Sequence, residues 1–439
     1  MLLALLLVAV SIAGILLAPW LIRVIAPGFQ AIPSKLDLAV SLTRMMFPYI
    51  FFIGLAALFM AILNSQGHFA APALSPTVLN IAMIVCAFYL TPYVDPPIEA
   101  LAIGVLIGGA GQLLVQIPAI WRRSRGTHWG IDISDPAVGR IGRLMVPGVA
   151  GLAITQVNVF IGTLLASLMG EGGISVLYYA FRLIQLPIGL FGVAIATAAF
   201  PTMARQAADR SLGEVAATVA YAIRLVLFVT LPAMVGLIIF RVPIVQLLFE
   251  RGAFDRTVTL ATAEVVLFYA VGLGAYVSNR ILVPAFYSLQ DTTTPVKIGM
   301  VTVMVNIASS LLLMRPMGLA GLALATALSS FVNLGLLLIA LQRRLGRLNG
   351  LRVRSLAQTT GAAAVMALIS VSLVYLRDPL TVEPFLYRAA VLSFELAISL
   401  AVFIGAAACM GSEELRGLVR GLTGRRREAR SEGSEEDCH

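Results

Sequence analysis

Charge is scarce in this sequence. Only 12% of its 439 residues are charged, 59% are hydrophobic, and the mean hydropathy is +0.94. A typical soluble domain has about 25% charged residues. A helix of about 20 apolar residues spans the hydrocarbon core of a bilayer, and such segments follow one another along the chain. The scarcity of charge excludes an ordinary soluble domain and predicts an all-α polytopic integral membrane protein.

Cysteine and histidine are also scarce, with three of each. Cys86, Cys409 and Cys438 form no CxxC pair, which argues against a disulfide framework or a zinc site. The sequence contains no HExxH or GxSxG motif. It also lacks the acidic outer-loop cluster that a polyprenyl-phosphate sugar transferase needs. The "GVLIGGAG" run follows no strand, so it predicts close helix packing and not a nucleotide loop. We therefore expect a transporter with no cofactor, and not an enzyme.

About twelve apolar spans are predicted, and the short connections between them make neighbouring helices antiparallel. The N-terminal run lacks a basic start and is longer than the apolar part of a usual signal peptide, so it reads as a transmembrane helix. The predicted spans cover residues 1–26, 38–64, 74–93, 98–121, 141–169, 174–204, 214–240, 257–288, 293–314, 317–342, 355–376 and 386–410.

Basic residues gather in loops on one side of this arrangement, mainly in 122–143, in 343–354 and in the tail. By the positive-inside rule that side is cytoplasmic, with both termini on it. The formal net charge of +9 therefore indicates membrane topology and not nucleic-acid binding. The tail from Ser412 is charged and poor in large apolar residues, so we expect a short amphipathic start followed by disorder. Its arginines could touch anionic membrane lipids, although a solvated tail is the simpler interpretation.

Two stretches of the sequence echo each other. "ILNSQGHFAAPALSPTVLNIA" and "FYSLQDTTTPVKIGMVTVMVNIA" each contain Ser, then Pro seven residues later, then Asn-Ile-Ala. The two stretches are six predicted helices apart, so both copies face the same way. The echo indicates two pseudo-symmetric lobes related by an axis along the membrane normal, which is a known plan among transporters.

Ionisable residues inside the spans are the main candidates for function, because charges at membrane depth are costly. Of 22 acidic residues only Glu264 and Glu395 lie in the interior of spans, away from the span ends, and both are read as helix-packing residues. Arg182 and Arg280 lie deep, whereas Arg44 and Arg224 lie nearer span ends. An excess of arginine over carboxylate indicates a cavity for an anion such as phosphate. The alternative for Arg182 is a structural pair with Glu264 or with backbone carbonyls.

Uncharged polar residues also lie at membrane depth. Gln185 follows Arg182 by one turn, and Pro187 removes an amide donor nearby, so a broken helix is expected beside the charge. Gln156 and Asn158 share one span, and Asn306 and Ser310 share a helix face. These side chains either line the cavity or bond across helices.

Four motifs resemble the MurJ (MviN) family of lipid II flippases, in the multidrug/oligosaccharidyl-lipid/polysaccharide exporter superfamily. They are "TRMMFPYIFFIGLAALFMAILNSQGHFAAPALSPTVLNIAMI", "YYAFRLIQLPIGLFGVAIATAAFP", "LLFERGAFD" and "AFYSLQDTTTPVKI". The resemblance implies a fold of fourteen helices, with two six-helix lobes and a terminal pair around a cationic cavity. It implies alternating-access export of lipid II, an undecaprenyl-pyrophosphate-linked peptidoglycan precursor, in the bacterial cytoplasmic (inner) membrane.

The resemblance also assigns residues and boundaries. The family's cavity arginine falls on Arg182, and an acidic position of some members falls on Gln185. The resemblance starts at the family's third helix, so we expect the first two helices, with further cavity arginines, to be missing. The implied divisions are an incomplete N-terminal lobe (1–121, family helices 3–6), a C-terminal lobe (141–342, family helices 7–12), a terminal helix pair (355–411) and a disordered cytoplasmic tail (412–439).

Some family members look to hold a sodium ion with acids on helices seven and eleven. The matching positions here are Gly162 and Ser310, so a coupling ion has only Asn306 and Thr326 as weak candidate ligands. The expected substrate-binding set is Arg182, Arg280, Gln185, Arg44, Gln156 and Asn158. Two other functions stay open: a cation-coupled drug exporter of the same superfamily, and a truncated, non-transporting membrane scaffold.

Overall fold

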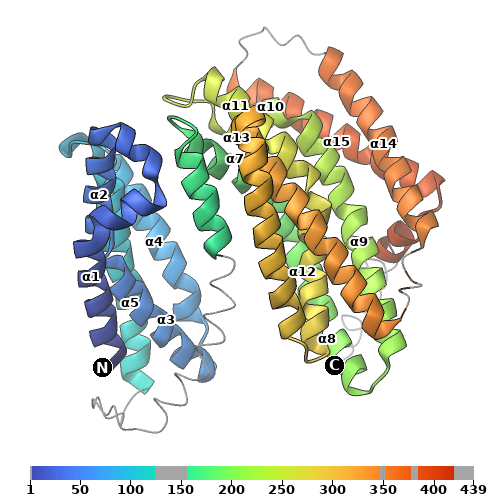
Figure 1. Cartoon of the computed structure of the whole chain (residues 1–439), viewed down its shortest axis with the longest axis horizontal. Coiled ribbons are helices and arrows are strands. Elements are labelled where there is room, and N and C mark those ends of the chain that lie inside the picture. Colours follow the sequence, from blue (N-terminus) through green and yellow to red (C-terminus); the bar gives the residue numbers. More distant parts are fainter. Residues whose placement is uncertain are drawn as a thin grey trace, which may run out of the picture. The chain divides into compact units, whose positions relative to one another are not determined.

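The computed structural model describes residues 2–123, 156–376 except for 347, 349 and 351, and 384–419. Within these residues all regular secondary structure is helical, as the composition predicts. The chain divides into two compact units, Met1–Ala153 and Ile154–His439, which we call unit 1 and unit 2 and describe one at a time (Figure 1).

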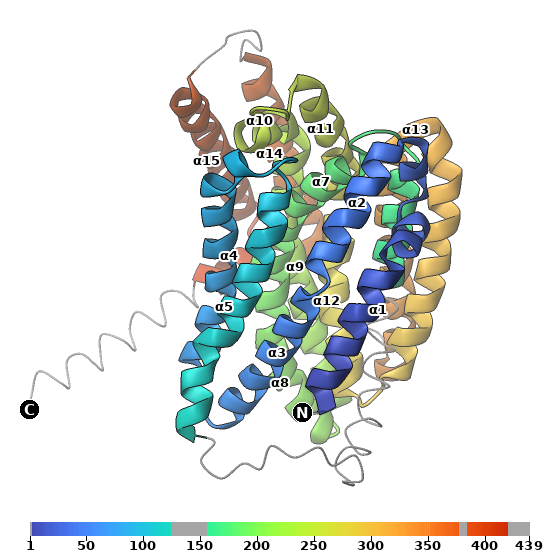
Figure 2. The same cartoon turned by 90° about the vertical axis from the view of Figure 1, so that its left-hand side faces the viewer.

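Unit 1 is a bundle of long apolar helices (Figure 2). Its elements are α1 (Leu2–Ile25), η1 (Pro27–Ala31), α2 (Pro33–Met46), α3 (Tyr49–Ser65), α4 (Ala70–Tyr89), η2 (Thr91–Tyr93) and α5 (Glu99–Arg123). α4 and α5 lie side by side, and α3 packs on the other side of α5. Phe47 and Pro48 separate α2 from α3, so the predicted span 38–64 is made of two successive helices.

Small residues allow α4 and α5 to approach closely. A methyl group added at Gly108 would lie 3.0 Å from the Leu79 Cα and 2.6 Å from its Cδ1 atom. At Gly104 the same addition would lie 3.1 Å from the Met83 Cα. In a bilayer, helices associate through such close packing, because lipid tails are as apolar as the side chains. The "GVLIGGAG" run is therefore a packing face, as predicted.

Unit 2 contains the remaining described helices. They are a short helix Gln156–Ser167, α7 (Gly173–Pro187), η3 (Ile188–Val193), α8 (Ala194–Ala208), α9 (Leu212–Ile239), α10 (Arg241–Phe249), α11 (Arg256–Val271), α12 (Leu273–Ser288), α13 (Thr293–Leu345), α14 (Val353–Leu376) and α15 (Phe385–Cys409). Residues 413–419 form about two last helical turns, and the tail beyond residue 419 lies outside the described residues.

The core of unit 2 is formed around α9, α11 and α12. These helices carry apolar residues on most faces, so they can be surrounded by other helices. Val219 and Val226 of α9 and Ile281 and Phe286 of α12 are fully buried and belong to one continuous cluster. A smaller cluster joins α9 to α14 and α15 through Phe228, Met366 and Phe403. The terminal helix pair is thus packed onto unit 2 through α9.

α13 is two antiparallel helices that meet at Gly318. The φ and ψ angles of Gly318 are 58° and −132°, which suit only glycine and reverse the chain direction. Polar contacts between the two arms keep one register. Thr302 is hydrogen-bonded to Asn333 at 3.1 Å, Asn306 to Ser329 at 3.3 Å, and Asp291 forms an ion pair with Arg344 at 2.8 Å. The residue numbers of each pair add up to the same value, as antiparallel arms require.

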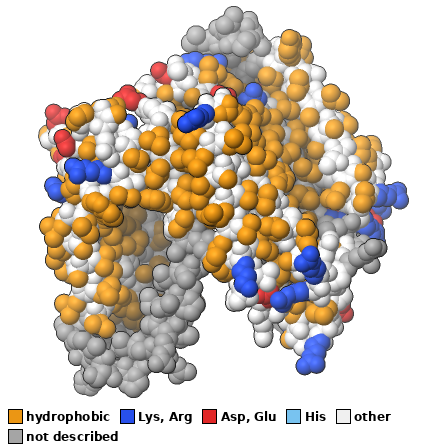
Figure 3. Space-filling view, in the orientation of Figure 1, with side chains coloured by type: hydrophobic (Ala, Val, Ile, Leu, Met, Phe, Trp, Pro, Cys, Tyr) orange, Lys and Arg blue, Asp and Glu red, His pale blue; other side chains and the backbone are white. Residues whose placement is uncertain are grey.

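The described residues contain nine helices long and apolar enough to cross a membrane, or ten if α11 and α12, bent by 46°, form one span. About twelve were predicted. The difference arises because α13 counts once although it covers two predicted spans, and because only residues 156–169 of the predicted span 141–169 are described, with a helix at Gln156–Ser167 that is too short to count. On the face of unit 2 in Figure 3, hydrophobic side chains cover the middle, and Lys and Arg lie toward the ends. The chain is a multi-pass membrane protein.

Candidate functional site

The candidate site begins at a break in a long helix. Pro187 ends α7, because proline has no N–H to donate to the preceding turn. The chain continues as the π-helical segment η3 and then as α8. A side chain at Gly192 would lie 2.7 Å from a Val277 methyl group, so glycine lets η3 pack against α12. Such π-helical turns occur frequently at functional sites. The predicted broken helix beside Arg182 is therefore present.

Arg182 projects from α7 one turn before this break. Its Nη2 atom donates to the Tyr178 hydroxyl at 2.5 Å, and its Nη1 atom donates to Gln185 Oε1 at 3.3 Å. Its guanidinium carbon lies 4.8 Å from the centre of the Tyr178 ring, a cation–π distance. Both partners lie on the same helix at i−4 and i+3, the positions that share a helix face. The guanidinium is thus held by two neutral groups.

The charge of Arg182 is not neutralised within the described residues. The ion pairs of arginine there involve Arg224, Arg256, Arg344 and Arg352. Glu264, the alternative partner considered from the sequence, is exposed and makes no ion pair with Arg182 among these contacts. Guanidinium carries five N–H donors. Two are used by Tyr178 and Gln185, which leaves three (five minus two) for another acceptor.

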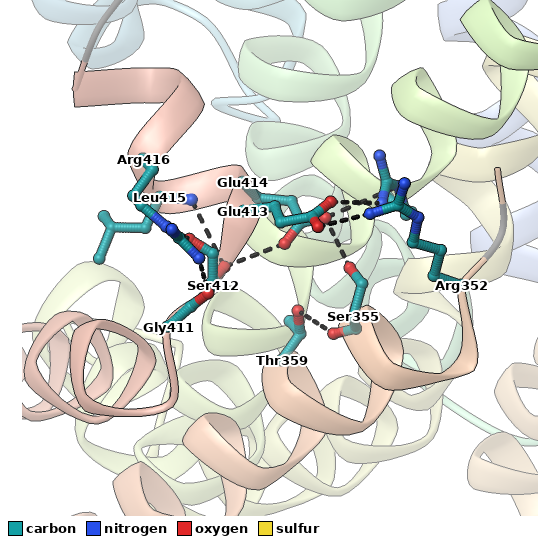
Figure 4. Close-up of polar contacts among 10 residues, drawn as sticks. Arg352, Ser355, Thr359, Gly411, Ser412, Glu413, Glu414, Leu415 and Arg416 are labelled. Atoms are coloured by element: carbon teal, nitrogen blue, oxygen red, sulfur yellow. Dashed lines mark hydrogen bonds and ion pairs between the residues drawn. The ribbon is translucent and has the colours of Figure 1, made fainter.

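Arg224 differs from Arg182 because it is paired. Its Nη1 atom lies 3.2 Å from Glu413 Oε2, and its Nε atom lies 3.6 Å from Glu414 Oε1. Arg352 also reaches Glu413, at 2.5 Å. Figure 4 shows the two carboxylates of the 413–419 helix pointing toward the start of α14. The sequence placed Arg224 near a span end, and in the structure its charge belongs to an ion-pair network.

Glu414 is the buried centre of this network, with 1% of its surface exposed. It accepts hydrogen bonds from Ser355 Oγ at 2.5 Å and from Ser412 Oγ at 2.9 Å. Burial alone would raise the pKa of its carboxyl group. The hydrogen bonds from Ser355 and Ser412 and the charge of Arg224 outweigh burial and lower that pKa. This network, which we call the C-terminal clamp, holds residues 412–419 to α9 and α14.

Beside Arg182, unit 2 contains a cavity of about 230 Å³. Tyr178 and Phe181 of α7 form one wall, and Tyr269 of α11 forms another. The polar lining residues are Asn158, Thr163, Asn306, Ser310 and Thr326. The lining, all from described residues, includes no carboxylate. Tyr178 therefore belongs both to this cavity and to the group that holds Arg182.

The α13 hairpin brings the polar residues of the cavity together. Asn306 donates from Nδ2 to Thr326 Oγ1 at 3.4 Å and to Ser329 Oγ at 3.3 Å. Asn306 and Ser310 are buried, at 4% and 3% exposed. Asn158 Oδ1 is also buried, and no hydrogen-bond partner for it is found among the described atoms. An unpaired buried acceptor costs free energy, so this oxygen is available to a donor or cation that enters the cavity.

The other predicted site residues are placed differently. Gln156 is exposed and does not line this cavity. Arg280 is exposed on α12, and no described contact joins it to Arg182. Arg44 lies in unit 1, where its Nε atom donates to the Ile15 carbonyl at 3.3 Å. Within unit 2 the structure thus groups Arg182 with Gln185, and Asn158 with Asn306 and Thr326. No described contact joins Gln156 or Arg280 to either group.

Sequence reasoning did not single out Tyr178 or Tyr269. The signal for Tyr178 was available, because a tyrosine four residues before an arginine faces it on a helix. Tyr269 offered no comparable signal, because it reaches the cavity from α11, far away in the sequence.

The model of the family "Lipid II flippase MurJ" matches residues 1–391. A probable lipid II flippase MurJ from Vibrio cholerae is 39% identical over 306 residues, which are 69% of this chain and 58% of that protein. The chain thus spans less than two thirds of this relative's length. The expectation that two helices are missing from the start is not supported, because the family match begins at residue 1.

Solved structures are also similar to this chain. A structure titled as the lipid II flippase MurJ in an inward closed conformation has a TM-score of 0.75 and 25% identity, and the match covers 95% of this chain and 82% of that one. An inward-facing multidrug resistance transporter of the MATE family has a TM-score of 0.68 and 17% identity, covering 79% of this chain and 80% of that one, and shares the fold. From the family match and the sequence identity to its relatives, the chain belongs to the MurJ lipid II flippase family.

Proposed function

We propose that the chain moves lipid II from the inner to the outer leaflet of the bacterial cytoplasmic membrane by alternating access. The observation that carries this proposal is Arg182, an exposed cation on a broken helix whose two side-chain partners are neutral. A pyrophosphate group offers several acceptor oxygens, and guanidinium can donate two parallel hydrogen bonds to such oxygens. Family membership supports a lipid-linked substrate with this group.

Arg182 would bind the pyrophosphate while the lipid tail stays in the bilayer. Gln185 would keep the guanidinium in place without neutralising it, since an amide carries no charge. Arg280 lies on α12, inside a predicted span, and is in none of the ion pairs of the described residues, so we propose that it assists. We propose Arg44, Gln156 and Asn158 as further substrate contacts, which contribute less to binding than Arg182.

The transport movement would be a rocking of two lobes. We propose the lobe boundaries 1–121 and 141–342, with the terminal pair 355–411 outside them. In this scheme both termini are cytoplasmic, which the basic loops support. Membrane lipids would surround the apolar flanks of both units.

A coupling ion would have neutral ligands only. Asn306 and Thr326 face one cavity, but each is already hydrogen-bonded to a neighbour. A sodium ion prefers a site with carboxylate oxygens nearby, and the described lining of this cavity has none. We therefore propose no ion-coupled step through these residues.

The test is rescue of a bacterial strain depleted of its own lipid II flippase. Wild-type chain is expected to restore growth, and Arg182→Ala is expected to abolish rescue at equal expression. Arg205→Ala is the matched control, because Arg205 lies on the same broken helix and its hydrogen bond among the described residues is to the Pro201 carbonyl at 3.4 Å. Full rescue by Arg182→Ala would refute the role of Arg182. Drug efflux without rescue would favour the drug-exporter alternative, and neither activity would favour the scaffold.

A further inference from the structure

Tyr178 is the closest neighbour of the Arg182 guanidinium. It contacts the group twice, through the hydroxyl at 2.5 Å from Nη2 and through the ring at 4.8 Å from the guanidinium carbon. Gln185 holds the opposite nitrogen at 3.3 Å. An arginine side chain carries about 2 kcal/mol of rotamer entropy. Contacts on both ends of the guanidinium remove much of this freedom before any ligand arrives.

The neutral character of Tyr178 matters for an anion site. A carboxylate at the same place would hold Arg182 more strongly, but it would cancel the positive charge and occupy the donors that a diphosphate needs. The tyrosine hydroxyl accepts one N–H and leaves the charge intact. A cation–π contact likewise orients the guanidinium without adding a negative charge.

The position of Tyr178 is itself supported by aromatic packing. Its ring packs edge-on against Tyr179 with centroids 5.9 Å apart. Tyr179 in turn packs edge-on against Phe254 at 5.4 Å and lies 4.9 Å from Phe249. Edge-to-face pairs at these distances are favourable. The hydroxyl that meets Arg182 is therefore presented from an ordered group of rings.

We propose that Tyr178 is a positioning residue for anion binding, one that orients the Arg182 guanidinium so that its free donors meet the diphosphate. This inference rests on the proposed function of Arg182 and adds a residue that acts through it. Tyr178 is 54% exposed and its other face lines the 230 Å³ cavity. Replacing its hydroxyl therefore leaves the core intact, and the variant can fold.

The experiment measures binding of inorganic pyrophosphate to the purified full chain in detergent by titration calorimetry. Tyr178→Phe keeps the ring and removes the acceptor, so affinity is expected to fall about tenfold, as for loss of a hydrogen bond to a charged group. Tyr178→Leu removes the ring as well and is expected to lose more. Tyr179→Phe is the matched control and should stay within about twofold of wild type. Melting temperatures should be equal across the Phe variants.

A second pair of variants separates positioning from a structural role. Arg182→Lys keeps the charge but lacks the planar fork that Tyr178 orients. In that background Tyr178→Phe is expected to change pyrophosphate affinity less than about twofold. An equal tenfold loss in both backgrounds, or wild-type affinity in Tyr178→Phe alone, would overturn the proposal. If Arg182→Ala binds pyrophosphate as tightly as wild type, the proposed function of Arg182 fails first, which is a distinct result.

Discussion

The ion pair between Asp291 and Arg344, which joins the two ends of the α13 hairpin, gives a quantitative prediction. Asp291 precedes α13, and its Oδ1 atom accepts from the backbone N–H groups of Thr293 at 3.1 Å and Thr294 at 3.0 Å. Its Oδ2 atom lies 2.8 Å from Arg344 Nη2 at the other end of the hairpin. The Asp291 side chain is 4% exposed. Burial alone would raise its pKa, but the hydrogen bonds from Thr294 and Thr293 and the Arg344 charge outweigh burial and lower the pKa to about 2.

The replacement Asp291→Asn removes the charge and leaves one oxygen to cap the helix. A pKa lowered from 3.8 to about 2 corresponds to roughly 2 kcal/mol of stability at pH 7, at about 1.4 kcal/mol per unit. Arg344 is half-exposed, so solvent screening makes this an upper estimate. The expected fall in Tm is roughly 3 °C, from an unfolding entropy of about 2.1 cal/mol/K per residue over a unit of this size.

The stability that Asp291 contributes is expected to decrease as the pH falls. Because the pKa of Asp291 is lower in the folded state, its contribution is complete above about pH 4 and is lost as the pH falls toward 2. Thermal unfolding in detergent should therefore show the full deficit of Asp291→Asn at pH 7 and a smaller one at pH 3. Arg343→Gln, which changes the neighbouring charge, is the control and should leave Tm unchanged. A variant as stable as wild type at pH 7, or a deficit independent of pH, would refute the reasoning.

Three further predictions concern other parts of unit 2. Glu414→Gln should weaken the C-terminal clamp by about 2 kcal/mol, because a charged acceptor of two hydrogen bonds is lost. Glu413→Gln should cost under about 1 kcal/mol, because the Glu413 side chain is 47% exposed. Hydrogen exchange of residues 412–419 measures both variants, and equal effects would contradict this prediction. Gly318→Ala should cost about 1–3 kcal/mol, since a side chain is strained at φ 58° and ψ −132°, and an unchanged Tm would contradict this. The pair Gly162→Asp and Ser310→Asp would place two carboxylates on the cavity that Gly162 and Ser310 line, so sodium, but not choline, is expected to raise the Tm of the double variant; no sodium effect would argue against the cavity geometry.

The sequence allowed prediction of those features that depend on local pattern. The helix break at Pro187, its place five residues after Arg182 and the glycine packing face of α5 all follow from spacing and residue type within one helix. Their physical causes act over one or two turns, so no tertiary information is needed.

Features that depend on distant residues could not be predicted in this way. Arg224 finds its carboxylate partners at Glu413 and Glu414, nearly 190 residues later, and nothing in either segment indicates the other. The hydrogen bond between Asn306 and Thr326 depends on the chain reversal at Gly318. Hydropathy alone indicates only an interruption between two apolar spans at that point. Gln156 and Asn158 were indistinguishable by pattern, yet only Asn158 lines the cavity. The two residues differ in whether the side chain points into the cavity, and the sequence pattern does not show this.

The central claim is that this chain translocates a lipid-linked diphosphate through a site that contains Arg182. The most direct measurement is translocation of fluorescent lipid II in proteoliposomes reconstituted with the purified chain, scored by the fraction protected from an external quencher. Wild-type chain is expected to move lipid II between leaflets. Arg182→Ala is expected to reduce the rate to that of protein-free vesicles, while Arg205→Ala retains it. Equal translocation by wild type and Arg182→Ala would contradict the account.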